Sequence, residues 1–400
     1  MTKIHVERLG KVRAAELTTA PLMLLVGKNN TGKSYVATLL WTLSNLFQVV
    51  SSSDEKRPTW WDKFVRTAKN EKAATIELNS ERQAALLDWL NRTLASQSSS
   101  VLSNAFAYPG FDATRVSLSA NEVRPVFSVA ITTTETGDSE KKLAFFTGTL
   151  SDAEGEPVYR FRMPMLRPNN LVRTSDRIFF EAVCRSAFGP EWSRMRNSVY
   201  IPAARTGLML AFRSLVAQSL DVEDDGRALS LPAPLQDFLQ RLAYSNVKVP
   251  VERSSLIDWL QRQVLHGAIE ASSDEIPAFS YRGEGMDVAL PLHATSSMIT
   301  EMAPFLLVLN GRFSTGVIIF EEPEAHLHLS AQRDMARAIA RLVNSGMRLV
   351  ITTHSDTFLQ QINNLMALHK RAEDKEFLSE FGYEGIDLID PDIAVAYEFS

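Results

Sequence analysis

The chain has 400 residues, of which 45% are hydrophobic and 22% are charged, and its formal net charge is −5. This composition is that of an ordinary globular protein, and its length exceeds what one hydrophobic core usually serves, so we expect one elaborated domain or two to three lobes. The net charge excludes the chain-wide basic field of many nucleic-acid binders, but it leaves a local basic surface, and therefore a nucleic-acid partner, open. The single cysteine, Cys184, excludes an internal disulfide and fits a reducing compartment.

The N-terminal residues suggest strands rather than a targeting signal. Residues 1–7 lack an apolar signal core, and no apolar run in the chain approaches the ~20 residues that span a bilayer. We therefore expect a cytoplasmic protein with no membrane partner. Residues 3–6 and 11–16 are expected to form short strands that flank the next strand, on an edge where an adenine base could rest.

A glycine-bounded loop is the first strong motif. The apolar run 22–26 predicts a buried strand, and a helix is expected from Lys33 to about Val50. Between them stands G-x-x-x-x-G-K-[ST], a loop whose backbone N–H groups cradle phosphate at a helix N-terminus. Lys33 can reach the outer phosphates and the Ser34 hydroxyl can join a Mg²⁺ shell, whereas the alternative is an ordinary strand-to-helix turn. The predicted nucleotide-binding residues here are Gly27, Lys28, Asn29, Asn30, Thr31, Gly32, Lys33, Ser34 and Tyr35.

The region 51–196 carries no nucleotide motif. A helix is predicted over 81–95, the polar residues 97–100 suggest a linker, and a further helix is expected around 176–188. Trp60, Trp61 and Trp89 are expected in a core or at a lobe interface rather than on a base-stacking platform. A small antiparallel sheet is predicted from alternating residues at 114–118, 125–133, 142–149 and 158–162.

A strand that runs into a loop and a helix is predicted over 197–210. Arg205 lies in this loop, just past the carboxyl end of the strand, where ligands gather in open α/β sheets. It is a candidate for nucleotide contact or for coupling the insert to the nucleotide, and the sequence leaves an ordinary surface turn equally open. Further helices are predicted over 235–242 and 254–265.

A second strong motif follows the apolar residues 316–320. There a predicted buried strand ends in Glu321 and Glu322, whose side chains point to opposite sides and can divide two tasks. Glu321 can hold Mg²⁺, and Glu322 can polarise a water molecule aimed at a γ-phosphate. The alternative is an acidic turn without catalytic function.

Three further segments complete the motif set. His354 ends the next predicted strand, 348–353, where it can hydrogen-bond a γ-phosphate, although a satisfied core histidine is the alternative. His326 and His328 have no third ligand nearby, which favours packing or a dimer contact over metal binding. Ser296 or Ser297 is expected to cap a helix whose N-terminus could reach the nucleotide of a second subunit.

The order of these motifs resembles the ATP-binding-cassette-type (ABC-type) heads of the SMC/RecF-like superfamily. Within that group the chain is most similar to the bacterial AAA ATPases related to the overcoming-lysogenization-defect (OLD) proteins of phage defence. The motifs that carry the resemblance are the phosphate loop, Ile-Pro-Ala-Ala-Arg, the serine-capped helix, Glu-Glu-Pro-Glu-Ala-His-Leu-His and Thr-Thr-His-Ser. They lie within residues 1–50, 197–210 and 276–365, which are under half of the chain.

The resemblance implies an α/β fold, an ABC/SMC-like P-loop NTPase head with an inserted α+β lobe. Lys33 and Ser34 match the Walker A residues, Glu321 takes the place of the Walker B aspartate and Glu322 that of the catalytic glutamate, while His354 matches the switch histidine. ATP and Mg²⁺ are the implied cofactors. The expected parts are head residues 1–50, an inserted lobe 51–196, a head segment 197–215, a helical insert 216–275 and the C-terminal head part 276–400.

The family also suggests a trans site. Ser296 and Ser297 match the signature segment that completes a partner's site, which implies a head-to-tail ATP-dependent dimer or a higher oligomer. Two departures stand out: Met298 replaces a glycine that often follows the signature serine, and Leu329-Ser330 replaces a frequent proline.

Four functions compete. The first is an ATP-hydrolysing sensor or scaffold subunit of an anti-phage defence system that controls a separate effector such as a nuclease. Relatives carry a Toprim nuclease domain after the ATPase, so we expect the nuclease on a separate polypeptide or on a continuation past Ser400. The alternative is a DNA repair or chromosome-handling ATPase of the SMC/RecF-like type. A non-hydrolysing nucleotide-gated module and a transporter ATPase are disfavoured, the former by Glu322 and the latter by the large insert.

Overall fold

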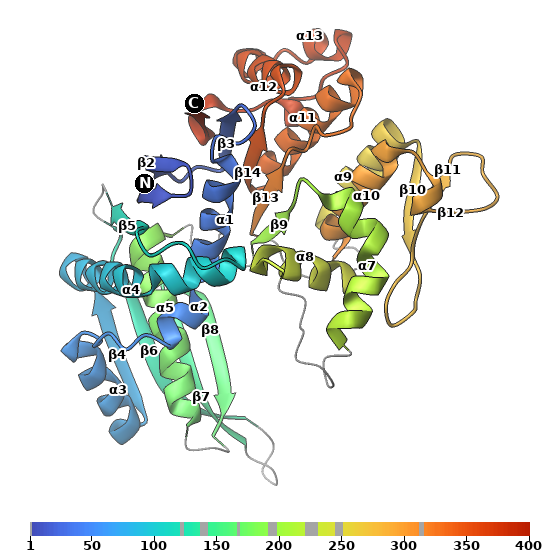
Figure 1. Ribbon diagram of the computed structural model, residues 1–400. Coiled ribbons are helices and arrows are strands. Elements are labelled where there is room, and N and C mark those ends of the chain that lie inside the picture. Colours follow the sequence, from blue (N-terminus) through green and yellow to red (C-terminus); the bar gives the residue numbers. More distant parts are fainter. Residues whose placement is uncertain are drawn as a thin grey trace. The chain divides into compact units, whose positions relative to one another are not determined.

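The computed structural model describes residues 2–120, 124–136, 143–165, 169–190, 198–220, 231–244, 251–311 and 316–400 (Figure 1). Their contacts divide the chain into two units. Unit 1 comprises Met1–Thr19, Asn45–Leu102 and Pro109–Arg196, and unit 2 comprises Ala20–Ser44, Ser103–Tyr108 and Asn197–Ser400. In the N-terminal part the contact boundaries fall at 19/20 and 44/45, and the first of the boundaries that the sequence suggested lies at 50/51.

A five-stranded parallel sheet is the centre of unit 2. Its strand order is β15-β3-β14-β13-β9, so β3 of the N-terminal region pairs on both sides with strands from the C-terminal region (Figure 1). The predicted α/β class is confirmed by this sheet with its surrounding helices. The strands are β3 (Leu22–Gly27), β9 (Val199–Ile201), β13 (Val317–Glu321), β14 (Arg348–Thr353) and β15 (Ala394–Phe399).

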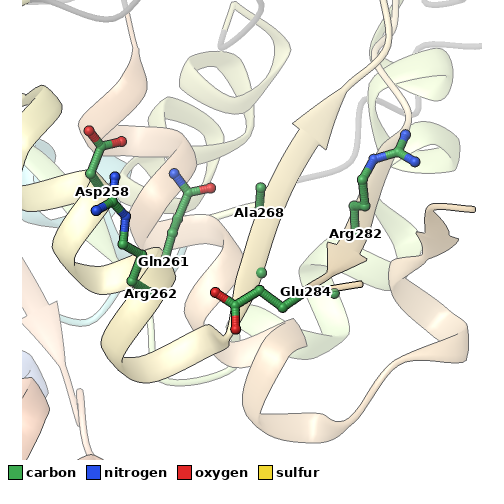
Figure 2. A pocket seen from close by; sticks show the side chains of 8 residues that line it. Asp258, Gln261, Arg262, Ala268, Arg282 and Glu284 are labelled. Atoms are coloured by element: carbon green, nitrogen blue, oxygen red, sulfur yellow. The ribbon is translucent and has the colours of Figure 1, made fainter. Parts of the chain in front are cut away.

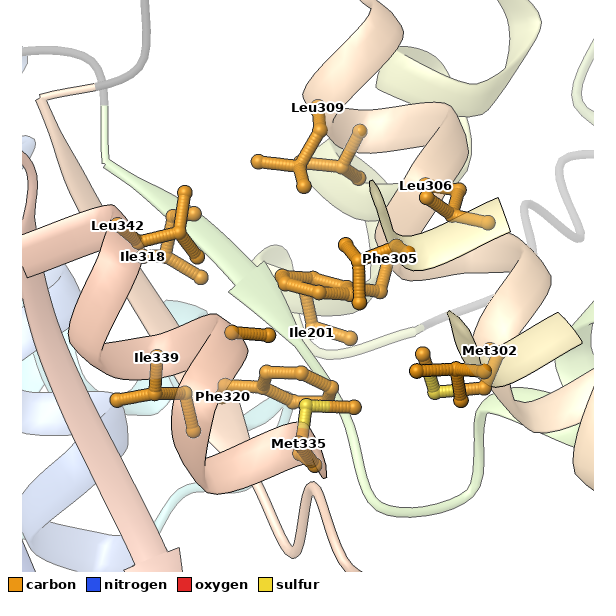
Figure 3. Packing of buried hydrophobic residues seen from close by; sticks show 14 of the residues in the cluster. Ile201, Met302, Phe305, Leu306, Leu309, Ile318, Phe320, Met335, Ile339 and Leu342 are labelled. Atoms are coloured by element: carbon orange, nitrogen blue, oxygen red, sulfur yellow. The ribbon is translucent and has the colours of Figure 1, made fainter. Parts of the chain in front are cut away.

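Both faces of this sheet are buried, which is why β3, β13 and β14 read as continuous apolar runs rather than alternating ones. Alternate residues such as Leu24, Phe320 and Ile351 belong to one core with several helices of the C-terminal half. In Figure 3, Phe320 lies between Phe305 and Met335, which belong to two of these helices. The other face packs on α1 (Lys33–Ser44), the helix that follows the glycine loop.

Helices account for most of the rest of unit 2. The predicted helix from Lys33 ends at Ser44, and the helix predicted over 254–265 changes to a π-helical turn at Gln261. Beyond α1, the helices are α7 (Arg205–Leu220), α8 (Ala233–Ala243), α9 (Val251–Leu260), α10 (Ser297–Asn310), α11 (Leu329–Asn344), α12 (Asp356–Leu368) and α13 (Lys375–Glu380). A small antiparallel sheet contains β10 (Gly267–Ala271), β11 (Phe279–Gly283) and β12 (Leu290–Pro291).

Unit 1 contains two antiparallel sheets. One has the order β2-β1-β5 and the other the order β4-β6-β7-β8, and α5 packs on β7 and β8 of the larger sheet (Figure 1). The strands are β1 (Thr2–Leu9), β2 (Val12–Thr18), β4 (Ala73–Leu78), β5 (Arg115–Ala120), β6 (Phe127–Thr136), β7 (Leu143–Ser151) and β8 (Pro157–Pro164). The helices are α2 (Phe47–Ser51), α3 (Thr59–Glu71), α4 (Ser80–Phe106), whose last turn from Ser103 belongs to unit 2, and α5 (Asn170–Phe188).

The core of unit 1 confirms one expectation about the tryptophans. Trp61 and Trp89 are both 0% exposed, and their rings contact Phe179 with centroid distances of 4.9 and 4.8 Å. Two buried rings cannot form a base-stacking platform. Trp60 is partly exposed and packs edge-on against Trp61.

Two sequence expectations are wrong in this region. The N-terminal strands do not flank β3: β1 pairs with β2 and β5, while β3 pairs with β14 and β15. Residues 97–100 are not a linker but lie within α4. Their hydroxyls remain satisfied there, since Ser98 donates to the Thr114 carbonyl and Ser100 to that of Gln97. Among the described helices, none has the length and apolar character that crossing a membrane requires.

Candidate functional site

The glycine loop follows β3 and has the backbone of a phosphate-binding loop. Three of its residues have positive φ: Gly27 (150°), Asn30 (66°) and Gly32 (109°). Glycine is required at position 27, because a Cβ there would lie 2.2 Å from the carbonyl oxygen of Phe399 in β15. The loop therefore turns sharply at the end of the strand and continues into α1, where Ser34 is exposed in the first turn.

Lys33 curls back over this loop. Its Nζ donates to the carbonyls of Gly27 (2.6 Å) and Lys28 (2.7 Å), and the residue is only 5% exposed. Burial lowers the pKa of the Lys33 ammonium below its usual value, while the charges of Glu322, Glu324 and Glu321 act in the opposite direction. A buried ammonium held only by two neutral carbonyls is arranged to accept a strong anion.

A cavity of about 570 Å³ opens beside the loop. This volume lies within the range of small-molecule sites. Loop residues and His354 line it together with the last residues of β15, whose Phe399 offers an aromatic surface. The lining residues are Val26, Gly27, Lys28, Asn29, Thr31, His354, Asp356, Leu359, Glu398, Phe399 and Ser400.

The paired carboxylates stand at the end of β13. Glu321 is 8% exposed and its Oε2 accepts from the backbone N–H of Ala203 at 3.3 Å. Glu322 has a left-handed backbone, with φ of 44°, and its N–H donates to the carbonyl of Thr352 at 2.9 Å. A non-glycine residue in this region costs of order 1–3 kcal/mol, and such strain is typical of functional sites.

His354 and Glu324 lie next to this pair. His354 Nδ1 is 3.4 Å from Glu322 Oε1 and 3.9 Å from Glu324 Oε1. Glu324 is 3% exposed, and its Oε1 accepts from Thr353 Oγ1 (2.6 Å) and from the N–H of His354 (3.2 Å). Its Oε2 is buried and has no hydrogen-bond partner among the residues that the structure describes. Glu324 thus holds Thr353, the last residue of β14, and the backbone of His354, which follows it.

Arg205 has a different position from the one the sequence suggested. It is 1% exposed, and its guanidinium donates to the carbonyls of Glu321 (3.0 Å) and Glu322 (3.1 Å) and pairs with Glu301 at 2.8 Å. Burial lowers the pKa of Arg205, with the charge of Glu301 the main opposing influence. In the structure Arg205 thus holds the carboxylate-bearing segment, and its contact with nucleotide stays a prediction.

The serine-capped helix has the predicted N-terminus. Ser296 is the N-cap of α10, and its Oγ accepts from the N–H of Ile299 at 3.4 Å. Ser296 and Ser297 are both exposed, as surface recognition requires. Tyr35, also expected near nucleotide, contacts the ring of Phe106 at a centroid distance of 5.2 Å.

The register of the parallel sheet brings three groups together: the glycine loop, the carboxylate pair and His354. Val26 pairs with Thr353 and Glu321 pairs with Thr352, so the loop, His354 and the two carboxylates leave the same edge of three adjacent strands. With ~4.8 Å between neighbouring strands, the outer two of these strand ends lie about 10 Å apart. That spacing suits a single triphosphate.

Sequence reasoning missed two residues of this region, Glu301 and Glu324. Glu301 is the only charged residue in α10, and a lone carboxylate in an apolar helix signals a buried partner. Glu324 belongs to the acidic motif itself, but its inward direction depends on the tight turn after β13.

A second cavity lies elsewhere in unit 2. It measures about 290 Å³ and lies beside the π-helical turn, with Asp258 and Gln261 on one side and Arg282 on the other (Figure 2). Arg282 is already paired with Glu270 at 2.8 Å.

In the described part of the chain, no group of three His, Cys, Asp or Glu side chains is placed to hold a metal on protein ligands alone.

The chain is similar in part to a known protein family. Residues 235–359 match the AAA ATPase domain. The matched segment includes Ser296, the carboxylate pair and His354, but not the glycine loop or Arg205. No curated protein gives a sequence match.

Three solved structures are similar to this chain over most of its length. An SMC head bound to the C-terminal winged-helix domain of ScpA is 10% identical with a TM-score of 0.36, and the match covers 90% of each chain. The SMC head domain from Thermotoga maritima is 11% identical with a TM-score of 0.30 and the same coverage. The Pyrococcus furiosus Smc head with an extended coiled coil, bound to the C-terminal domain of ScpA, is 12% identical with a TM-score of 0.33, covering 90% of this chain and 92% of that one.

Proposed function

We propose that this protein is an ATPase of the ABC/SMC-like type that binds ATP with Mg²⁺ at residues 27–34 and hydrolyses its γ-phosphate bond. The observation that carries the proposal is the register of β3, β14 and β13, which brings Lys33, His354 and Glu322 to one edge of one sheet. A phosphate loop alone would support binding. The adjacent carboxylates support turnover as well.

The loop would bind the triphosphate. Lys33 would exchange its two carbonyl partners for phosphate oxygens, which are stronger acceptors. Ser34 and Glu321 offer the hydroxyl and carboxylate oxygens that a hard cation prefers. When bound, Mg²⁺ neutralises phosphate charge, and the protein's part is to hold its ligands in place. The Ala203 N–H fixes Glu321 for that task.

Glu322 would act as the general base. Its side chain is 27% exposed and can accept a proton from the attacking water. His354, 3.4 Å away, would orient that water and contact the γ-phosphate. Glu324 would position His354 through its backbone N–H.

Ser296 and Ser297 would complete the site of a second molecule. Both lie exposed at the start of α10, whose N-terminal N–H groups favour an anion. A head-to-tail dimer with two ATP molecules at its interface follows from this role. The expected oligomer thus forms only when nucleotide is present.

Phosphate release from ATP tests the proposal. Wild-type protein should release phosphate only with Mg²⁺ present, and its turnover per molecule should rise with protein concentration as dimers form. If the protein binds ATP but releases no phosphate with Mg²⁺ at any protein concentration, it is a non-hydrolysing nucleotide-gated module. Absence of ATP binding would refute the proposal.

The cellular role rests on the resemblance to OLD-related ATPases. We propose a sensor or scaffold subunit that controls a separate effector, such as a nuclease, during phage infection. Cells that carry the protein with its neighbouring genes should resist phage, and Lys33→Ala should remove the resistance. A repair or chromosome-handling role predicts instead ATP-dependent DNA binding that weakens steeply with salt, without protection from phage.

A further inference from the structure

Glu301 is the only charged residue of α10, and its carboxylate is 2% exposed. Oε2 lies 2.8 Å from Arg205 Nε, and Oε1 accepts a short hydrogen bond from Thr206 Oγ1. Oε1 also lies 3.9 Å from Nε2 of His326 in the turn after β13. One buried carboxylate therefore joins α10 to the start of α7 and to the acidic turn.

The guanidinium of Arg205 extends these contacts to the carboxylate pair. Besides Glu301, it donates to the carbonyls of Glu321 at 3.0 Å and Glu322 at 3.1 Å. Its Nε also donates to the backbone carbonyl of Glu301 at 3.1 Å. A guanidinium offers five N–H donors in a fixed plane, so a shift of any one acceptor shifts or breaks the others.

Side-chain packing also links α10 to β13. Phe305 of α10 contacts Phe320 of β13 with ring centroids 5.1 Å apart, and the two rings lie side by side in Figure 3. Arg205 lies over the Phe320 ring, 5.1 Å from its centroid. Phe320 directly precedes Glu321, so α10 and the carboxylate pair are held both by packing and by the buried charges.

We propose that the Arg205–Glu301 ion pair couples the exposed N-terminus of α10 to the geometry of Glu321 and Glu322. The inference rests on the proposed function, in which Ser296 and Ser297 contact the nucleotide of a second molecule. Engagement of that nucleotide would move α10, and Arg205 would pass the movement to the carbonyls of both carboxylate residues. Arg205 and Glu301 are thus positioning residues, and the device makes hydrolysis depend on dimer formation.

The left-handed backbone of Glu322 suits this role. A residue with φ of 44° leaves that conformation readily when a neighbouring contact changes. Its carbonyl is held by Arg205 and its N–H by Thr352. The orientation of the proposed base therefore depends on a donor, Arg205, whose own carboxylate partner, Glu301, lies on α10.

The test compares three variants in one ATPase assay. Glu301→Gln keeps the shape and an acceptor for Thr206 but removes the charge, and Arg205→Lys keeps the charge but cannot hold three acceptors in one plane. The matched control is Asp387→Asn, which removes a buried carboxylate, 0% exposed, from its pairing with Arg337 and Arg341. Thermal unfolding and ATP affinity are measured for each, so that turnover is expressed per folded molecule.

Glu301→Gln and Arg205→Lys should lower kcat at least ~10-fold with KM for ATP within ~3-fold, and turnover should no longer rise with protein concentration. Asp387→Asn should destabilise the fold but keep the kcat of the wild type per folded molecule. If the first two variants do not fold, Thr206→Val replaces them. This milder change removes one donor to Glu301 and should give a kcat between those of the wild type and of an uncoupled protein. A wild-type kcat and concentration dependence in the folded variants would overturn the coupling while leaving the ATPase intact. A wild type without turnover would instead refute the proposed function.

Discussion

The Nδ1 atom of His354 lies 3.4 Å from Oε1 of Glu322, although the two residues follow different strands of the sheet. β14 and β13 are adjacent and parallel, and Glu321 pairs with Thr352, so the residues that follow these strands meet beyond one edge. A histidine and a carboxylate that lie side by side at this edge can both contact one water molecule that approaches from the cavity side. That relationship separates a hydrolytic site from a phosphate-binding loop alone.

Glu322→Gln should keep ATP bound and remove turnover. The amide keeps the size of the side chain but cannot accept the proton of the attacking water, so we expect a loss of about 10²- to 10⁴-fold in kcat. Phosphate release and calorimetric ATP binding, measured together, check this. Glu380→Gln, at an exposed position of α13, is the control and should behave as wild type. Wild-type phosphate release by Glu322→Gln would assign the base to another residue.

Lys33→Ala should weaken ATP binding by at least ~100-fold, which corresponds to about 2.8 kcal/mol. The substitution removes the only ammonium that reaches over the loop from its own helix, and phosphate charge would then face neutral carbonyls. Isothermal calorimetry gives the affinity. Lys370→Ala removes an exposed lysine elsewhere in unit 2 and should leave the affinity unchanged. Equal affinity of Lys33→Ala and wild type would exclude the loop as the ATP site.

Ser297→Arg should block ATP-driven dimers without loss of ATP binding by the single molecule. The change leaves the cap intact, since Ser296 accepts the N–H of Ile299, and places a bulky charge on the exposed helix start. Size-exclusion chromatography with and without ATP measures the association. Ser379→Arg introduces the same charge on α13 and should dimerise normally. Normal dimers of Ser297→Arg would argue against the trans role of this segment.

Asp387→Asn should destabilise the fold by about 3–5 kcal/mol, because it leaves two arginines without their buried partner. Asp387 accepts from Arg341 Nε at 2.7 Å and from Arg337 Nη2 at 2.9 Å. Burial alone would raise the pKa of Asp387, but the hydrogen bonds from Arg337 and Arg341 outweigh it and hold the pKa below its usual value. The free energy of unfolding in urea measures the loss.

The sign of the pH dependence follows from that lowered pKa. The stabilisation is complete above the usual aspartate pKa of about 3.9, and it is lost as the pH falls through the lower pKa of the folded state. The difference between wild type and Asp387→Asn should therefore shrink in acid. Asp374→Asn, in an exposed pair with Arg371, should cause no measurable change at neutral pH. A constant difference down to the acid limit of folding would show that the carboxylate charge is not responsible.

Much of unit 2 could be predicted because its signals are local. An apolar run that ends in glycine or in paired acids predicts a buried strand with functional groups at its carboxyl end, and β3 and β13 have this pattern, while the apolar run of β14 leads to His354. The serine cap of α10 is equally local, since one hydroxyl and one N–H three residues later define it. The conclusion that these segments meet depended on the known geometry of parallel sheets.

The pairing of the N-terminal strands could not be predicted in the same way. β1 and β5 are separated by about a hundred residues, and alternation of polar and apolar residues says that a strand has one buried face but not which strand it joins. The burial of Arg205 could not be predicted from the sequence either. Its loop was predicted, but the choice between solvent and a buried carboxylate depends on Glu301, which comes from a distant helix.

In the proposed site, Lys33 holds one triphosphate and the carboxylates of β13 face it. A crystal structure with Mg²⁺ and a non-hydrolysable ATP analogue would show whether this arrangement forms. We expect one nucleotide whose β- and γ-phosphate oxygens lie within about 3 Å of Lys33 Nζ, with the metal beside Ser34 and Glu321 and the γ-phosphate facing Glu322. A nucleotide bound away from this edge, or bound here with the carboxylates too distant to share its metal ion, would contradict the account.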